Sequence, residues 1–171
     1  MKLERKQADQ HTQVVKFLEE SNNIENVWDQ DSLEQAIRAW DFIINKDQLS
    51  IEAILQTHKI LMTGKLNPQN VGTFRTHSIW IGTREGKPWF ILSKLMEEWT
   101  KSINETVINT LNDKDLIKKQ HVDFEIIHPF ADGNGRIGRI LMNWTFTKVD
   151  LPILIVKERE KQQYYQWFLS N

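Results

Sequence analysis

The sequence contains no cysteine, which excludes disulfides and thiolate metal sites from its 171 residues. Glycine and proline occur only 7 and 4 times, and we find no linker, repeat or low-complexity segment. No apolar run is long enough to span a membrane, and residues 1–5 do not resemble the start of a signal peptide. The formal net charge is −1, so the chain as a whole has no electrostatic attraction to nucleic acid or to anionic membranes.

What remains is the composition of an ordinary globular protein, with 40% hydrophobic and 26% charged residues. The length suits one core, so we expect a single domain over residues 1–171. The absence of cysteine fits a reducing compartment, and we expect a cytoplasmic protein, with a role as a secreted effector left open. Neither a nucleic acid nor a membrane is an expected partner, and a homodimer remains open.

Apolar residues at helical spacing dominate the chain and predict an all-α fold. Asp31, Ser50 and Ser93 stand where N-caps are expected before three of these helices. The expected helices cover about 9–20, 32–45, 51–63, 93–103, 114–127, 134–148 and 158–169.

Residues 76–91 break the helical pattern. Two short apolar runs, 79–81 and 88–91, lie on either side of a polar, glycine-bearing tip, which predicts a small β-hairpin. Because an isolated hairpin is only marginally stable, we expect it to pack on the helices or to act as a flap.

The most informative segment is residues 128–139, His-Pro-Phe-Ala-Asp-Gly-Asn-Gly-Arg-Ile-Gly-Arg. Glycine and asparagine permit backbone shapes that aim several N–H groups at one point, and a helix starting there adds its free N–H groups and the positive end of its dipole. Arg136 and Arg139 lie one turn apart at that end, so both can reach one anion. His128 can take up a proton near neutral pH. The segment therefore predicts a polyphosphate site with a general base beside it.

This segment resembles the motif of the Fic family, His-x-Phe-x-Asp/Glu-Gly-Asn-Gly-Arg-x-x-Arg. All eight defined positions match: His128, Phe130, Asp132, Gly133, Asn134, Gly135, Arg136 and Arg139. Other phosphate motifs fit poorly, because the Gly-Lys-Ser/Thr of a P-loop is absent and residues 114–127 look helical rather than like the strand that precedes a dinucleotide fingerprint.

The resemblance implies a role for each residue. His128 would be the general base that removes the proton of a target hydroxyl, and Asp132 would hold Mg²⁺ or Mn²⁺ on the phosphates of ATP. The expected phosphate and nucleotide ligands are Gly133, Asn134 (including its side-chain amide), Gly135, Arg136, Arg139, Tyr164 and Tyr165. Flap residues Ile79, Trp80 and Ile81 would hold the target segment, and Arg75 would tie the base of the flap to the domain. We expect His58 and His77 to be structural.

A second match lies far from the first. Ser21-Asn22-Asn23-Ile24-Glu25-Asn26 resembles the inhibitory motif Ser/Thr-x-x-x-Glu-Gly/Asn of Fic proteins that carry it ahead of the core. The resemblance implies that residues 10–30 form an inhibitory segment with Ser21 and Glu25 as its motif residues, in which the carboxylate of Glu25 occupies Arg139, the partner that the γ-phosphate of ATP needs. Residues 76–91 would be the flap, and 128–148 the active-site loop and motif helix.

The expected function is transfer of AMP from ATP to a Ser, Thr or Tyr hydroxyl of a protein, including this protein itself, under inhibition by Glu25. Three alternatives remain open: removal of AMP by water that Glu25 orients, transfer from another nucleotide donor, and a nucleotide-binding regulatory module without turnover. Transfer of phosphate from ATP is disfavoured, because the relatives known for it have a lysine where this chain has Gly135.

Overall fold

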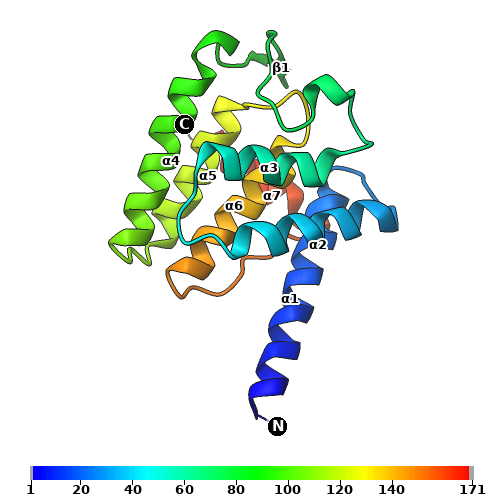
Figure 1. Cartoon of the computed structure of the whole chain (residues 1–171), viewed down its shortest axis with the longest axis vertical. Coiled ribbons are helices and arrows are strands. Elements are labelled where there is room, and N and C mark those ends of the chain that lie inside the picture. Colours follow the sequence, from blue (N-terminus) through cyan, green and yellow to red (C-terminus); the bar gives the residue numbers. More distant parts are fainter. Residues whose placement is uncertain (1, 170–171) are drawn as a thin grey trace.

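The computed structural model describes residues 2–169 and the side chains of residues 8–169, and it is built from helices with one small hairpin (Figure 1). The predicted all-α class with a β-hairpin is confirmed. The helices are α1 (Lys2–Ile24), α2 (Gln30–Ile44), α3 (Ile51–Met62), α4 (Leu92–Ile108), α5 (Lys114–Ile127), α6 (Asn134–Lys148) and α7 (Lys161–Gln166). Strands β1 (Trp80–Ile81) and β2 (Arg84–Glu85) pair antiparallel, and short 3₁₀ turns cover Pro68–Asn70, Trp89–Ile91 and Glu158–Glu160. Among the described residues, no helix combines the length and apolarity that crossing a bilayer requires.

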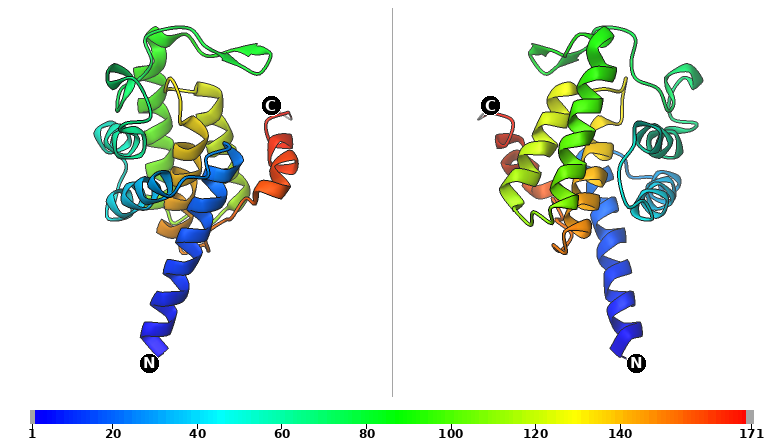
Figure 2. Two further views of the ribbon diagram at one scale, coloured as in Figure 1. Left: turned by 90° about the vertical axis from the view of Figure 1, so that its right-hand side faces the viewer. Right: turned by 60° about the vertical axis from the view of Figure 1, so that its left-hand side comes forward.

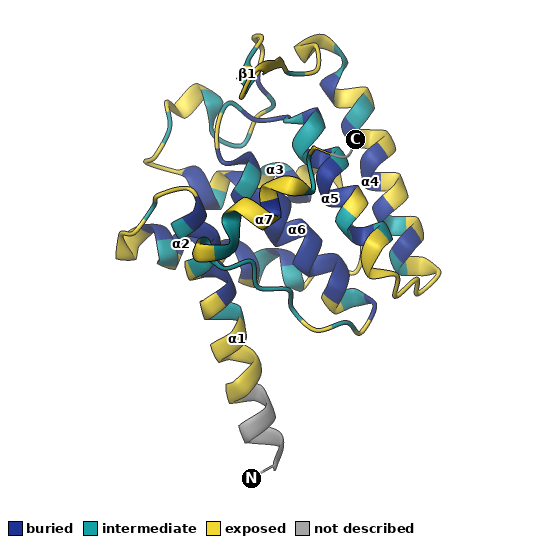
Figure 3. Cartoon of the chain, turned by 180° about the vertical axis from the view of Figure 1, so that it is seen from behind, coloured by how far each residue is buried: buried dark blue, intermediate teal, exposed yellow. Residues whose placement is uncertain are grey.

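Helix α6 runs through the centre of the molecule. Its residues 136–146 are all buried. The apolar residues whose spacing predicted this helix pack in the core and are at most 1% exposed: Ile137, Ile140, Leu141 and Trp144. Helices α1, α2, α4 and α5 all contact it, and the views of Figures 2 and 3 show it enclosed by them. A helix that is buried on every side can hold polar residues only where other groups satisfy them.

Helix α1 is longer than the periodicity predicts. The expected end near residue 20 is wrong, because Ser21, Asn22 and Ile24 continue the helix and are at most 3% exposed. The second half of α1 packs in the core, where Phe17 meets Trp40 edge to face at 5.7 Å. Its first half extends away from the other helices, and the described side chains 8–13 are exposed there (Figure 3).

Two of the three expected caps are wrong. Helix α2 is capped by Asp29 instead of Asp31, because the Asp29 carboxylate accepts the backbone N–H of Ser32 at 2.9 Å. Helix α4 begins at Leu92 directly after a 3₁₀ turn, with no side-chain cap, so Ser93 lies inside it. Ser50 caps α3 as predicted, through the N–H of Ala53.

The hairpin is shorter than predicted, and its second strand is a different segment. Ile81 pairs with Arg84 across a turn at Gly82, whose φ of +60° favours glycine. The apolar run Trp89–Ile91, expected to be the second strand, instead forms the 3₁₀ turn that leads into α4. Helix α7 is also shorter than the expected 158–169, because its first residues form a 3₁₀ turn.

The cap assignment gives a direct test. Asp29→Ala should lower the thermal unfolding midpoint by more than Asp31→Ala does, because only Asp29 satisfies an N–H of the first turn of α2 and also pairs with Lys65 at 3.0 Å. Circular dichroism on both variants provides the measurement. Equal midpoints for the two variants would contradict the assignment.

Candidate active site

His128 ends α5 and begins the loop that leads into α6. It is the C-cap of α5 in the left-handed conformation (φ 51°, ψ 62°), and its N–H donates to Phe124 O at 2.9 Å. Its Nδ1 lies 3.1 Å from Glu125 O, a carbonyl that can only accept, so Nδ1 carries the hydrogen and Nε2 is left as a base. Burial lowers the pKa of His128, which keeps the imidazole neutral and able to accept a proton.

The loop after His128 is held by its own backbone and by His58. Phe130 is fully buried and stacks on the His58 ring, with centroids 3.9 Å apart and planes at 7°. His58 Nδ1 accepts the N–H of Gly72 at 2.9 Å, so its Nε2–H donates to Asp132 O at 3.1 Å. His58 is therefore structural, as expected, and burial lowers its pKa to about 4.

Asn134 closes the same loop. Its Oδ1 accepts the Phe130 N–H and its Nδ2 donates to Phe130 O, both at 2.9 Å, and the residue is 2% exposed. Both polar atoms of the amide therefore hold the backbone of Phe130, and the structure does not support the expected contact of this amide with a phosphate. The backbone N–H of Asn134 remains at the start of α6.

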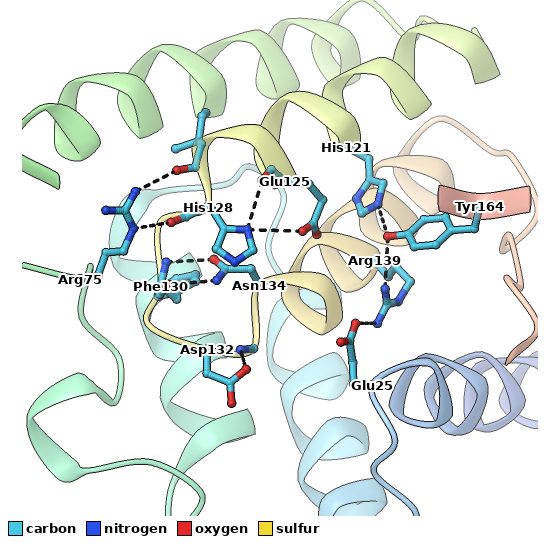
Figure 4. Close-up of polar contacts among 12 residues, drawn as sticks. Glu25, Arg75, His121, Glu125, His128, Phe130, Asp132, Asn134, Arg139 and Tyr164 are labelled. Carbon is cyan, nitrogen blue, oxygen red and sulfur yellow. Dashed lines mark hydrogen bonds and ion pairs between the residues drawn. The ribbon is translucent and has the colours of Figure 1, made fainter. Parts of the chain in front are cut away.

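Arg75 joins the flap to the catalytic loop, as predicted. It is 2% exposed, and its guanidinium donates to His128 O at 2.8 Å, His77 O at 2.9 Å and Lys87 O at 2.5 Å. Its own N–H donates to Pro129 O at 2.9 Å. The base of the flap and the loop that carries His128 are therefore one connected unit (Figure 4).

The N-terminus of α6 is open. Gly133 precedes it with a φ of +81°, where a Cβ would lie 2.9 Å from Met62 Sδ, and no side chain caps the helix. Arg136, in the first turn, is 6% exposed, and its Nε has no hydrogen-bond partner among the described residues. A buried guanidinium beside uncapped N–H groups is an arrangement suited to an anion.

Arg139 is occupied. It is 2% exposed and donates from Nε to Ser21 Oγ (2.8 Å), from one Nη to Ser21 O (2.9 Å) and Glu25 Oε1 (2.7 Å), and from the other Nη to the Tyr164 hydroxyl (3.2 Å). Burial alone would lower the pKa of Arg139, but Tyr164 and Glu25 raise it above its usual range, so the guanidinium stays charged. The structure thus brings the Glu25 carboxylate onto Arg139 as predicted, and it adds two contacts from Ser21 that were not predicted.

Glu25 also lies over Gly135. A Cβ at position 135 would collide with Glu25 Oε1 and lie 3.1 Å from an Arg139 Nη. Glycine at this position therefore leaves space for an acidic group against the first turn of α6.

A cavity of about 700 Å³ opens between this helix end, the flap and α7, which lie on the same side of the molecule (Figure 2). His128, Gly135, Arg139, Tyr164 and Tyr165 all line it, together with Ile81 from the flap. Trp80, which is 71% exposed, and Ile79, which is partly buried, do not line the cavity, so only one of the three expected flap residues does. The remaining lining residues are Glu25, Gly82, Thr83, Arg84, Glu125, Ile126, Phe168 and Leu169.

Asp132 is exposed in the loop that joins α5 to α6, and its Oδ1 accepts the Gly133 N–H at 2.6 Å. Within the part of the chain that the structure describes, no cluster of three or more acidic or histidine side chains could hold a metal by itself. Magnesium commonly binds one or two carboxylates together with substrate phosphates and water, so a single carboxylate next to a phosphate site fits such an ion.

Two buried polar residues of α5 were not predicted as part of the site. His121 Nε2 lies 2.8 Å from the Tyr164 hydroxyl, and burial lowers the pKa of His121 to about 3. The side chain of Glu125 is only 13% exposed, its partial burial raises the pKa of the carboxyl to about 8, and it lines the cavity next to His128. Their spacing could have identified them from the sequence, because His121 and Glu125 are polar residues four positions apart on the otherwise apolar side of a predicted helix.

Together these elements define a helical domain in which a histidine-bearing loop and two buried arginines meet at an open helix N-terminus. Residues 48–146 match the model of the Fic/DOC family, and the chain belongs to that family. Over 130 residues it is 30% identical to the protein adenylyltransferase Fic of Drosophila erecta and 28% identical to that of Drosophila melanogaster. These alignments cover 75% of this chain but only 26% of each relative, so the chain spans about a quarter of their length.

Solved structures share the fold. A Fic domain-containing signaling protein from Bacteroides thetaiotaomicron superposes with a TM-score of 0.76 at 17% identity, covering 89% of this chain and 69% of the other. A Fic family protein from Desulfovibrio desulfuricans gives a TM-score of 0.71 at 22% identity, covering 91% and 56%.

The buried histidines predict how stability depends on pH. His58 titrates near pH 4 when folded and near 6.5 when unfolded, so below pH 6.5 the unfolded chain binds more protons and stability falls. By pH 4.5 this residue alone should have removed about 2 kcal/mol. Denaturant unfolding gives the free energy of unfolding at pH 7 and at pH 4.5. The loss of this free energy between the two pH values should be smaller in His58→Asn than in the parent, even though the variant is less stable at pH 7. His77→Asn, at an exposed histidine, is the control and should keep the parent's change.

Proposed function

We propose that this chain is a protein adenylyltransferase that moves AMP from ATP to a Ser, Thr or Tyr hydroxyl of a protein. The observation that carries the proposal is the convergence of His128, the open first turn of α6 and Arg139 in one cavity of about 700 Å³. Arg136, buried and without a hydrogen bond at Nε, adds a second cation beside that turn. Support also comes from the relatives, which are named protein adenylyltransferases.

In this mechanism the target hydroxyl attacks the α-phosphate of ATP and gives its proton to His128 Nε2. A bond forms between the hydroxyl oxygen and the α-phosphorus, the bond to the oxygen that bridges to the β-phosphate breaks, and pyrophosphate leaves. Catalysis consists mainly of positioning the phosphates and stabilising their charge, through the α6 N–H groups, Arg136 and Arg139. Asp132 would hold Mg²⁺ or Mn²⁺, which would neutralise phosphate charge.

We further propose that Glu25 inhibits this reaction in the resting protein. Its carboxylate takes the Arg139 Nη at 2.7 Å and the space over Gly135, where the terminal phosphates of a correctly placed ATP would need to bind. Withdrawal of the whole inhibitory helix would expose Phe17, Leu18 and Ile24 from the core. The Glu25 side chain, 37% exposed at the end of α1, can swing away at much lower cost.

His128→Ala should abolish transfer and leave ATP binding nearly unchanged, because the proposed phosphate ligands lie on α6 rather than on the imidazole. The expected loss is about 10²–10⁴-fold in kcat. Labelled ATP measures the transfer, and calorimetry measures the binding. His11→Ala, at an exposed histidine of α1, should transfer AMP like the parent. Near-normal labelling by His128→Ala would refute the base assignment.

Glu25→Gly should raise AMP transfer by roughly 10–100-fold, since a charge-assisted pair of about 1.5–3 kcal/mol no longer competes for Arg139. Glu25→Gly combined with Arg139→Ala should return toward the inhibited level, because the γ-phosphate then has no partner. The control is Glu19→Ala on the exposed face of α1, which should leave transfer unchanged. If Glu25→Gly gains no forward activity and instead loses the ability to strip AMP from a modified protein, AMP removal is the main reaction.

Transfer should require Mg²⁺ or Mn²⁺. Excess chelator should stop it, and Asp132→Ala should stop it in either metal, because Asp132 is the carboxylate expected next to the phosphates. Mass spectrometry for an added AMP on the protein, or on proteins of a lysate, gives the measurement. Unchanged activity in excess chelator would rule out the metal requirement.

A further inference from the structure

Glu125 is a largely buried acid that has no role in the proposed transfer mechanism. It lies in the last turn of α5 with its side chain 13% exposed, between His128 and α6 (Figure 4). Its Oε1 has no hydrogen-bond partner among the described residues and fills the space over Gly138, where a Cβ would collide with it. A carboxyl group in such a place costs free energy that an apolar side chain of similar size would avoid. A buried, incompletely satisfied acid at the wall of a reaction cavity therefore calls for a functional explanation.

His128 is the group that this acid faces most directly. Nδ1 of His128 lies 3.1 Å from the backbone oxygen of Glu125 and 3.9 Å from its carboxyl Oε2. Both neighbours of Nδ1 thus come from Glu125, and the backbone oxygen keeps the hydrogen on Nδ1. The opposite nitrogen, Nε2, is left free for the proton of a substrate.

We propose that Glu125 is the positioning residue of the catalytic base, orienting His128 through its backbone oxygen and sharing through its carboxylate the positive charge that the imidazole gains. The proposal rests on the function proposed for His128. In the step itself the proton of the target hydroxyl moves to Nε2, the hydrogen on Nδ1 stays in place, and the carboxylate at Oε2 faces the imidazolium so formed. No further proton donor or acceptor is needed.

The charged groups around the carboxyl determine when it is ionised. Burial raises its pKa to about 8, Arg139 opposes this shift and Glu25 adds to it. The titratable groups that face it lie on or directly beside four helices: Glu25 after α1, His121 on α5 and His128 at its C-cap, Arg139 on α6 and Tyr164 on α7. Below its pKa the carboxyl is neutral and gives the imidazole little support. Above its pKa it is an anion that favours the imidazolium, so the basicity of His128 rises as Glu125 loses its proton.

The first experiment needs no activity. In a titration of the full chain from pH 5.5 to 9, the ¹⁵N shifts of the His128 ring should report hydrogen on Nδ1 and a second inflection near pH 8 as Glu125 ionises. Glu125→Gln should remove that inflection and keep the tautomer, because the backbone oxygen is unchanged. Glu125→Asp should retain an inflection. Asp123→Asn is the matched control, since Asp123 lies on the same helix and pairs with Lys119 at 2.8 Å on the outer side.

The second experiment measures AMP transfer with Glu25→Gly in every variant to remove the inhibition. Glu125→Gln should lower kcat about 10–100-fold, the scale for losing a residue that supports a catalytic group through a hydrogen bond or charge, with the KM for ATP little changed. In the Glu25→Gly parent, kcat/KM should rise with pH as Glu125 loses its proton, and the midpoint of this rise should lie below pH 8 because the charge of Glu25 is gone. In Glu125→Gln this rise should disappear. A purely structural role would alter the amount of folded protein and leave the pH profile in place.

Folding of the variant is checked by thermal unfolding. The folded parent holds the Glu125 proton up to about pH 8, whereas the unfolded chain loses it above about pH 4.5, so the parent becomes less stable as pH rises between these values. Glu125→Gln lacks this loss and should therefore gain stability relative to the parent over the same range. An absent inflection for His128, together with an unchanged kcat in Glu125→Gln, would overturn the proposal. An inflection that depends on Glu125 in a protein that transfers no AMP under any condition would uphold the pairing of Glu125 with His128 and refute the proposed function instead.

Discussion

Burial of α6 on every side is the constraint on which the rest of the structure depends. Because its residues 136–146 are all enclosed, Arg136 and Arg139 cannot reach bulk water, and their charges need partners that the fold supplies or that a ligand brings. The same burial aims the open first turn of the helix into the cavity, with Gly133 setting the approach of the chain. An arrangement suited to an anion thus follows from the packing of one helix.

Arg139 links the end of α1 to the cavity beside α7. It binds Ser21 of the first helix, Glu25 directly after that helix and Tyr164 of the last helix, and Glu20 accepts the Glu158 N–H at 2.7 Å. Helices α1 and α7 are therefore joined through this arginine and through the turn before α7. Under the proposed function, a phosphate of ATP would have to replace the Glu25 carboxylate and its share of these contacts, so the two groups would compete directly for Arg139.

The catalytic loop shows how buried polar groups fix a reactive side chain. His58 uses both ring nitrogens and its ring face to hold the loop, Asn134 uses both amide atoms, and Arg75 holds the carbonyl of His128. Each of these groups is buried and satisfied by backbone atoms, so the loop has little freedom to rearrange. Under the proposed function, preorganisation of this kind would let His128 meet a substrate without first reordering its surroundings.

The sequence by itself determined the helical class, the hairpin, and the spacing that gathers His128, Asp132, Arg136 and Arg139 at one helix start, because all of these depend on local periodicity and on residues within twelve positions. It also pointed to Ser21 and Glu25, but only through a resemblance, since residues 118 positions apart in the sequence, such as Ser21 and Arg139, give no local signal of their contact. The tertiary structure decided the rest. Packing kept Ser21 helical, and the chain path selected Asp29 over Asp31 as a cap. The Asn134 amide contacts the backbone of Phe130 instead of the expected phosphate site. The packing of α5 against α6 places the largely buried Glu125 beside His128. These features depend on burial, which is a property of the assembled core and not of any one segment.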